Sequence, residues 1–235
     1  NTTTGASNTA VGRSALQLNT TGANNVAVGN HALDANTTAS NNTAVGYAAG
    51  GAVNTGFDNT LIGGLAGDAL TDADYNVAIG KEALSDDTLG SRSTAVGWSA
   101  LANQNFTSAT NSYNTAMGFQ AGLSVSTGVQ NTLIGALAGD AITTGGDNIA
   151  LGYLALSSDT TGQRNVAIGR AALFAQNLSG GALSYNTAIG YNAGTAVTTG
   201  VNNTLIGGLS GDAITTGHSN VAMGVSALGA TTTAT

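Results

Sequence analysis

The sequence of 235 residues predicts an all-β protein, a β-solenoid (parallel β-roll) in which each short repeat forms one coil. A five-residue motif, asparagine, β-branched, small, aliphatic and glycine, occurs thirteen times, and most copies lie 17 residues apart. Composition agrees, because only 7% of the residues are charged and none is proline, whereas surface helices are built from Glu, Lys and Arg. The motif glycines are Gly12, Gly29, Gly46, Gly63, Gly80, Gly97, Gly118, Gly135, Gly152, Gly169, Gly190, Gly207 and Gly224.

Each position of the repeat has its own residue preference. The first is Asn in twelve copies, with Ser93 as the exception, and is expected to be a turn residue or part of a stacked side-chain ladder. The second and fourth positions are β-branched or aliphatic, so we expect them on the inward face of a short strand, and the third on the outward face. The glycine at the fifth position should end the strand with a positive φ or a close backbone approach. A second short extended stretch is expected around positions eight and nine.

A longer period lies over the repeat. The ninth position runs Leu, Leu, Gly, Gly along the chain, and two repeats carry four-residue insertions, near 102–113 and 174–185. Together these give super-repeat blocks at 42–113, 114–185 and 186–235. One repeat is too small to bury its own apolar side chains, so stacked repeats must share a core. We therefore expect one solenoid over 1–235, and the lack of polar end repeats suggests a fragment of a longer array.

The charge pattern excludes several kinds of partner. The net charge is −7, with only five basic residues, so no basic stripe can displace counterions from nucleic acid. No apolar run approaches the roughly 18 residues of a membrane span, so no membrane insertion is expected. The chain has no cysteine, which removes disulfides and thiolate metal sites.

Catalytic and metal-binding patterns are not found in the sequence. The only histidines, His31 and His218, lie far apart and outside any metal-ligand spacing. Asp68, Asp140 and Asp212 recur every 72 residues, about four coils apart, so they cannot share a calcium ion, and a role in stabilising turns is expected. We predict no enzyme activity, no cofactor and no bound metal.

Large side chains concentrate at the sixth position, directly after the motif glycine. They include Tyr47, Trp98, Phe119, Tyr153 and Tyr191, which are candidate contacts with a ligand or partner. Exposed aromatic rings could stack on sugars or fill a partner's pocket. They could equally shield the strand edge or pack against a neighbouring chain. Tyr75, Tyr113 and Tyr185, at the last position of the repeat, allow the same two interpretations.

The repeats "NTAVGYAAG", "NVAIGKEAL", "NVAIGRAAL" and "NTAIGYNAG" resemble two related groups of proteins. These are the repetitive shafts of phage and bacterial tail fibres and the YadA-like heads of trimeric autotransporter adhesins. The resemblance covers the whole chain, and the 17-residue period with "TTG" closers is nearer to the tail fibres. It implies a left-handed coil, a homotrimer and an extracellular place on a virion tail fibre or bacterial surface.

The residues offer a reason for a trimer. If the third position faces outward, its row of Ala with Leu61, Leu133 and Leu205 would form an uncharged face suited to packing between chains. The expected function is then a structural fibre segment that spaces or presents a receptor-binding tip. The alternatives are an adhesin head that binds surface glycans through its aromatic edge, an ice-binding solenoid, or a filament that stacks end to end. An outward Thr lattice suited to ice is not expected, because the second-position Thr would share the inward face.

Overall fold

The computed structural model describes residues 4–230 and 232–233 and confirms the predicted fold class. These residues contain no helix and form a parallel β-solenoid of about thirteen turns with a 17-residue spacing. The chain divides into two compact units, Asn1–Asn114 and Thr115–Thr235, a division within one residue of the boundary between two super-repeat blocks. The prediction of one single solenoid stays a prediction.

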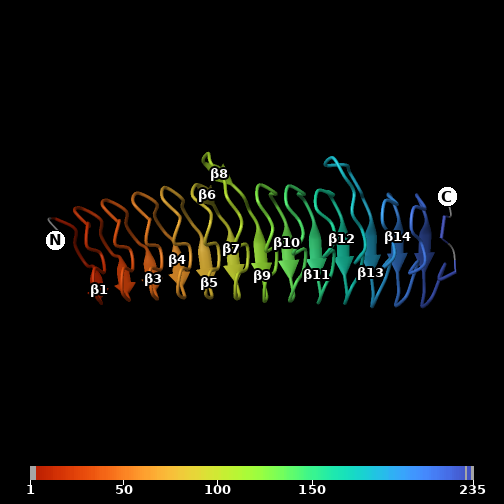
Figure 1. Cartoon of the computed structure of the whole chain (residues 1–235), viewed down its shortest axis with the longest axis horizontal. Helices are drawn as coiled ribbons and strands as arrows, with labels where there is room; N and C mark the ends of the chain where they lie inside the picture. The colour runs from red at the N-terminus through yellow and green to blue at the C-terminus, as the bar shows by residue number, and fades with distance from the viewer. Residues whose placement is uncertain (1–3, 231, 234–235) are drawn as a thin grey trace. The chain divides into compact units, whose positions relative to one another are not determined.

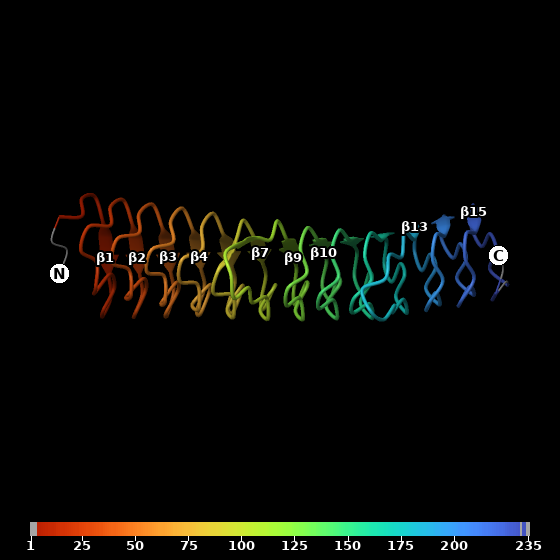
Figure 2. The ribbon, with the colours of Figure 1, turned by 90° about the horizontal axis from the view of Figure 1, so that it is seen from above.

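Each repeat contributes one three-residue strand, formed by the second to fourth positions of the motif. In unit 1 these strands are β1 (Thr9–Val11), β2 (Val26–Val28), β3 (Thr43–Val45), β4 (Thr60–Ile62), β5 (Val77–Ile79) and β7 (Thr94–Val96). In unit 2 they are β9 (Thr115–Met117), β10 (Thr132–Ile134), β11 (Ile149–Leu151), β12 (Val166–Ile168), β13 (Thr187–Ile189), β14 (Thr204–Ile206) and β15 (Val221–Met223). Within each unit neighbouring strands pair in parallel with equivalent positions opposite one another, as Thr9 with Val26 (Figures 1 and 2).

The two insertions stand out from the coils at the top of Figure 1, on the side opposite to that toward which the strand arrows point. In the first, β8 (Thr110–Asn111) pairs in parallel with β6 (Gly90–Ser91) of the preceding coil. In the second, a single bridge joins Leu183 to Gln163. Both insertions therefore add backbone pairing beside the main sheet of their unit.

The predicted orientation of the strands was wrong. The middle residue of the strand, the third position, is the buried one: Ala27, Ala44 and Ala78 are all 0% exposed. The residues on either side point outward and are half-buried or exposed, as at Val11 and Ile62. A three-residue strand shows one alternation only, so the inward side had to be inferred from residue type, and the larger β-branched residues suggested the wrong side.

The predicted packing row between chains was consequently also wrong. Leu61, Leu133 and Leu205 are 0% exposed and lie in the core of their own units. A side chain without exposed surface in one chain cannot form a contact with another. Any interface on the sheet must use the second and fourth positions instead.

The motif glycine behaves as predicted. Gly29 and Gly46 both have φ of +142°, and a Cβ on Gly29 would lie 2.2 Å from the carbonyl oxygen of Gly46 in the next coil. The stretch after this glycine is not extended, contrary to expectation. It is a run of turns in which positions seven and nine take left-handed backbone angles, as His31 (φ 59°) and Leu33 (φ 47°) do.

Position nine divides the coils into two kinds. In leucine coils the ninth residue is Leu and the twelfth is polar; in glycine coils the ninth is Gly and the twelfth is aliphatic. The twelfth-position pairs are Asn19 and Asn36, Asp87 and Gln104, and Asp159 and Gln176 in leucine coils, and Val53 and Leu70, Val125 and Ile142, and Val197 and Ile214 in glycine coils. All twelve are 0% exposed. Positions nine and twelve therefore share one buried space, in which a large side chain at one position is combined with a small or polar residue at the other.

The first-position asparagines form a buried ladder inside each unit, which confirms one of the two predicted roles. The Oδ1 of Asn25 accepts a hydrogen bond from the backbone N–H of Asn42 at 2.9 Å, and the Nδ2 of Asn25 donates to Ala39 O at 2.8 Å. The same pair of bonds recurs at Asn148, which accepts from Asn165 N at 3.0 Å and donates to Gly162 O at 2.9 Å. Each amide thus satisfies backbone groups of two coils.

Candidate functional site

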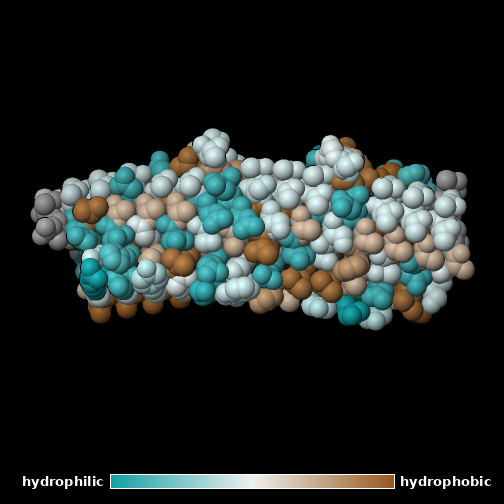
Figure 3. All heavy atoms as spheres, viewed as in Figure 1, coloured by the Kyte–Doolittle hydropathy of each residue, from teal (hydrophilic) through white to brown (hydrophobic). Residues whose placement is uncertain are grey.

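The outer face of the sheet is the first candidate surface. We define the sheet face as the first and third residues of the thirteen three-residue strands, which are Thr, Val, Ile, Leu or Met at every position. Its most exposed large members are Val11, Ile62, Met117, Ile149, Leu151, Val221 and Met223. In the space-filling view hydrophobic side chains form a row along the edge below β1 to β4 (Figure 3). The sheet face therefore carries no charge in either unit.

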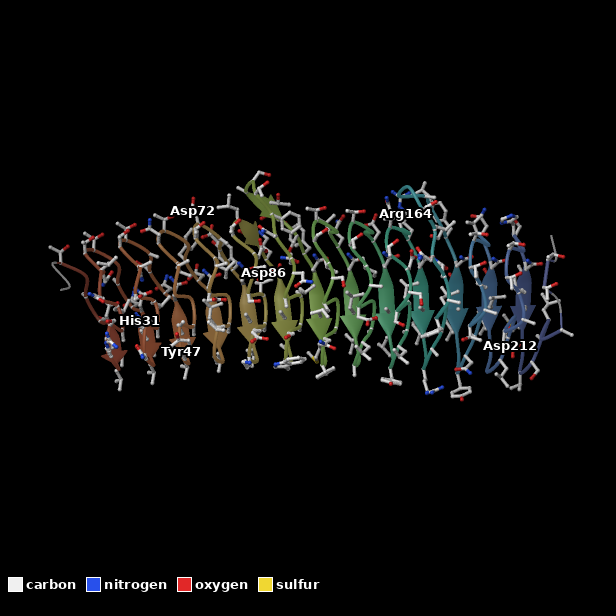
Figure 4. All side chains as sticks on the ribbon, in the orientation of Figure 1. His31, Tyr47, Asp72, Asp86, Arg164 and Asp212 are labelled. Atoms are coloured by element: carbon white, nitrogen blue, oxygen red, sulfur yellow. The ribbon has the colours of Figure 1, made fainter. Side chains whose placement is uncertain are left out.

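The sixth-position ridge, the row of side chains directly after the motif glycines, is the second candidate surface. All five of its predicted contact residues are exposed: Tyr47 (58%), Trp98 (41%), Phe119 (49%), Tyr153 (47%) and Tyr191 (54%). Figure 4 shows Tyr47 at the edge of unit 1 opposite the turn that carries Asp72. The structure thus places the aromatic rings within reach of a partner.

Part of this ridge is held in place by stacking. In unit 2 the guanidinium of Arg170 lies 5.9 Å from the ring centre of Tyr153 and 5.5 Å from that of Tyr191, in the coils on either side. Cation–π contacts of this kind orient exposed aromatic rings and contribute roughly 0.5–1 kcal/mol. The sequence placed these aromatic residues on one row, but it did not predict the role of the arginine between them.

A second aromatic row lies at the last position of the repeat. In unit 1 Tyr75 packs edge-to-face on Phe57, with ring centres 5.2 Å apart, and Arg92 stacks on Tyr75 at 4.6 Å. In unit 2 Arg164 donates to the hydroxyl of Tyr185 at 2.6 Å and lies beside the second insertion (Figure 4). Hydrogen bonding to Tyr185 is the largest cause that raises the pKa of Arg164. These contacts fasten the neighbouring coils together.

The histidines and the recurring aspartates do not form a joint site. His31 Nδ1 lies 2.8 Å from Asp34 Oδ2, and His218 Nδ1 accepts from Val201 N at 3.2 Å. Over residues 4–230 and 232–233, no three His, Asp or Glu side chains lie close enough together to hold a metal ion. The Oδ1 atoms of Asp68, Asp140 and Asp212 are buried without a hydrogen-bond partner. For Asp68 and Asp140 a hydrogen bond from the residue's own backbone N–H lowers the pKa against the larger effect of burial, so the turn-stabilising role stays a prediction.

Two buried carboxylates were not identified from the sequence. Asp87 and Asp159 are the twelfth residues of the leucine coils that precede the two insertions, and both are 0% exposed. Burial is the largest cause that raises the pKa of each, above the opposing effect of their hydrogen bonds. The signal that could have found them is their spacing, because each stands 17 residues before the Gln of an inserted coil.

Comparison with protein-family models, with curated protein sequences and with solved structures found no match. Among the described residues there is no helix that is long and apolar enough to cross a membrane. The candidate surfaces are therefore interpreted from their own chemistry.

Proposed function

We propose that this chain is a structural segment of a trimeric extracellular fibre, such as a phage tail fibre or a cell-surface appendage, which spaces or presents a receptor-binding tip. The observation that carries the proposal is the uncharged sheet face. Monomeric proteins rarely leave contiguous apolar patches above a few hundred Å² in water. A sheet face that consists of Thr, Val, Ile, Leu and Met side chains is suited to packing against further copies of the same chain.

The trimer of this proposal differs from the one that the sequence suggested. Its contacts are made by the side chains at the second and fourth positions of the repeat, because the third-position side chains are buried in the core of each unit. The repeated hydrogen bonds between coils, such as Thr60 N to Asn76 O at 2.8 Å, supply the mechanical continuity that a fibre needs. No catalytic chemistry is part of this role.

The first test is the native mass in solution by light scattering, against 22.8 kDa for one chain. We expect three times that mass for the wild type and a single-chain mass for Ile62→Lys with Ile134→Lys, which place charge on the sheet face. Thr38→Lys with Thr127→Lys, on exposed turns, is the matched control and should leave the mass unchanged. A monomeric wild type would contradict the trimer, and a mass that grows with concentration would indicate a filament formed by end-to-end association.

A second candidate is an adhesin head that binds cell-surface glycans or a receptor. The observation in its favour is the exposure of the five aromatic residues of the sixth-position ridge. Replacement of Tyr47, Trp98 and Tyr153 by Ala should abolish binding to cells while leaving the native mass unchanged. Binding that survives this triple change would remove the candidate.

The orientation of the strands also bears on ice binding. Thr occupies the second position in eight repeats and faces outward in register between neighbouring strands, contrary to the sequence-based expectation. A flat face of this kind can order water, but only in a chain that leaves it uncovered. Thermal hysteresis in a monomeric sample would favour ice binding over the fibre, and its absence in that sample would exclude it.

A further inference from the structure

The arginine of the sixth-position ridge in unit 2 has no part in the fibre proposal. Arg170 is exposed and belongs to the coil between those of Tyr153 and Tyr191. Its Nη1 donates to the hydroxyl of Tyr191 at 3.3 Å and to Asn192 Oδ1 at 3.5 Å, both longer than the usual range of about 2.7–3.2 Å. Within the described part of the chain neither its Nε nor its Nη2 donates a hydrogen bond. Most of the hydrogen-bonding capacity of this guanidinium is therefore unused.

Arg170 also lacks a carboxylate partner. The ion pairs of residues 4–230 and 232–233 are His31–Asp34, Lys81–Glu82 and Arg164–Asp147. The sixth to eleventh positions of its own coil and of the two neighbouring coils, 153–158, 170–175 and 191–196, contain no Asp or Glu. In a chain with a net charge of −7, the surface formed by these turns thus carries one uncompensated positive charge.

The lysine at the same position of a unit 1 coil has different surroundings. Lys81 pairs with the adjacent Glu82 at 2.9 Å, and the turns of its own and the preceding coil also carry Asp86 and Asp68. An anion that approaches Lys81 would meet these carboxylates, whereas one that approaches Arg170 meets none in the adjoining turns. A guanidinium also presents parallel N–H groups that bind a carboxylate in a bidentate manner, which an ammonium cannot do. Arg170 is therefore the better anion site of the two.

The tyrosines beside Arg170 add an aromatic face to the site. The guanidinium lies over one face of each ring, 5.9 Å from the centre of Tyr153 and 5.5 Å from that of Tyr191. The opposite face of Tyr191 is directed toward the next coil, in which Leu209 N donates to Tyr191 O at 2.8 Å. The sixth residue of that coil is Gly208, and a Cβ built on it would lie no closer than 3.9 Å to any atom beyond its chain neighbours. The outer face of Tyr191 therefore borders open space.

We propose that Arg170 and Tyr191 form a binding site for an acidic sugar, that is, an oligosaccharide with one carboxylate on a terminal ring. The carboxylate accepts hydrogen bonds from the unused N–H groups of Arg170, which makes them charge-assisted on both sides. A neighbouring sugar ring stacks on the outer face of Tyr191, in the space over Gly208. Tyr153 is a positioning residue, because its ring holds the guanidinium from the other side.

A single cation beside an exposed aromatic face is the feature that selects this class of ligand. Nucleic acid carries a phosphate on every nucleotide, and a chain with a net charge of −7 and five basic residues would repel such a polyanion. An oligosaccharide with one carboxylate needs only one cation. The site goes beyond the fibre role and rests on the second candidate function, which it narrows to three side chains of unit 2 and to one class of glycan.

The test is isothermal titration calorimetry of the whole chain, at low ionic strength, with sialyllactose and with lactose. Sialyllactose carries one carboxylate, and lactose is its neutral counterpart. We expect the wild type to bind sialyllactose roughly tenfold or more tightly than lactose, because a hydrogen bond to a charged group stabilises a complex by about that factor. The affinity for sialyllactose should fall as salt is added, since salt screens an exposed charge pair.

Four variants separate charge, geometry and stacking. Arg170→Gln should weaken binding of sialyllactose by about 10- to 100-fold and leave binding of lactose unchanged. Arg170→Lys keeps the charge without the parallel N–H groups, so it should retain only part of the affinity. Tyr191→Ala should weaken binding of both sugars. Arg92→Gln is the matched control, because Arg92 also stacks on a tyrosine but lies near the carboxylate of Asp74, and the loss of its charge should not change either affinity.

Equal affinity for the two sugars, wild-type binding of sialyllactose by Arg170→Gln, or an equal loss in Arg92→Gln would each overturn the site at Arg170. If both sugars bind independently of Arg170 but are lost on replacement of the ridge aromatics, the acidic-sugar site is removed and the second candidate function stands. If neither sugar binds to the wild type, both fail, whereas the fibre proposal depends on the native mass alone. Binding of a single-stranded oligonucleotide through Arg170, without binding of sialyllactose, would also overturn the proposal.

Discussion

The leucine coils and the glycine coils of unit 1 have the same backbone but different cores. Position nine is left-handed in both, with φ of 47° at Leu33 and 58° at Gly50. In the glycine coils the space of the missing leucine is filled from two other positions, by Leu61 in the strand and by Val53 and Leu70 at position twelve. A Cβ on Gly67 would lie 2.8 Å from Leu61 Cδ2 and from Leu70 Cδ1.

This difference explains the long period of the sequence. A coil can place its large apolar group at position nine, which leaves room for a polar side chain at position twelve, or at position twelve, which requires glycine at position nine. The core remains close-packed in either arrangement. The super-repeat is therefore a packing solution, and its polar coils are the ones that can accommodate an insertion.

The largest expected effect on the free energy of unfolding comes from placing the core residues of a leucine coil in a glycine coil. Gly67→Leu overpacks the core, and Leu61→Ala leaves a cavity that should lower the free energy of unfolding by about 2–5 kcal/mol. A triple variant that adds Leu70→Asn to these two changes recreates the combination of Ala27, Leu33 and Asn36 in a leucine coil, because leucine at position nine requires a polar side chain at position twelve. It should be less destabilised than the sum of the single changes by roughly 1–3 kcal/mol in urea unfolding. If the changes in the free energy of unfolding were strictly additive, they would contradict the idea that these positions share one buried space.

A smaller effect should distinguish the two kinds of polar coil. Asp87→Ala leaves the amides of Gly90, Phe106 and Gln104 without their acceptor, at about 1–3 kcal/mol for each buried group left unpaired. Asn19→Ala removes a single hydrogen bond to Gly22, so the expected loss is about 1 kcal/mol. Equal losses in urea unfolding would show that the carboxylate has no special role.

The smallest effect concerns a feature that both kinds of coil share. Thr37 Oγ1 in a leucine coil donates to Asn54, and Thr71 Oγ1 in a glycine coil donates to Thr88 O at 3.1 Å. Replacement of either Thr by Val should cost roughly 0.5–1 kcal/mol, since Thr37 loses its hydrogen bonds to Asn54 O and Oδ1 and Thr71 loses its one to Thr88 O, all of them at least partly accessible to solvent. A clear difference between the two variants in thermal unfolding would indicate that the core type alters the outer turns.

The sequence determined the architecture because the evidence for it is periodic. Thirteen glycines, most of them 17 residues apart, with asparagine before all but one of them and alanine after all but one, predict stacked coils. Gly29 and Gly46 adopt the backbone that their position requires. The exposure of the aromatic row at position six was also predictable, because it follows directly from the turn after that glycine. Because each residue preference recurs in most of the repeats, it predicted the local structure reliably.

Only the tertiary structure decided which side of each strand is inside. Residue type favoured Val and Ile as core residues, but the interior of so narrow a coil has room for Ala at position three, with Leu admitted only where glycine opens space beside it, as at Leu61. The same three-dimensional information revealed the buried carboxylates, because Asp87 meets Phe106 across a coil and not along the chain. A strand of three residues alternates between polar and apolar positions too few times for the sequence to show which side is buried. Contacts between coils join residues of different repeats, so no pattern within a single repeat predicts them.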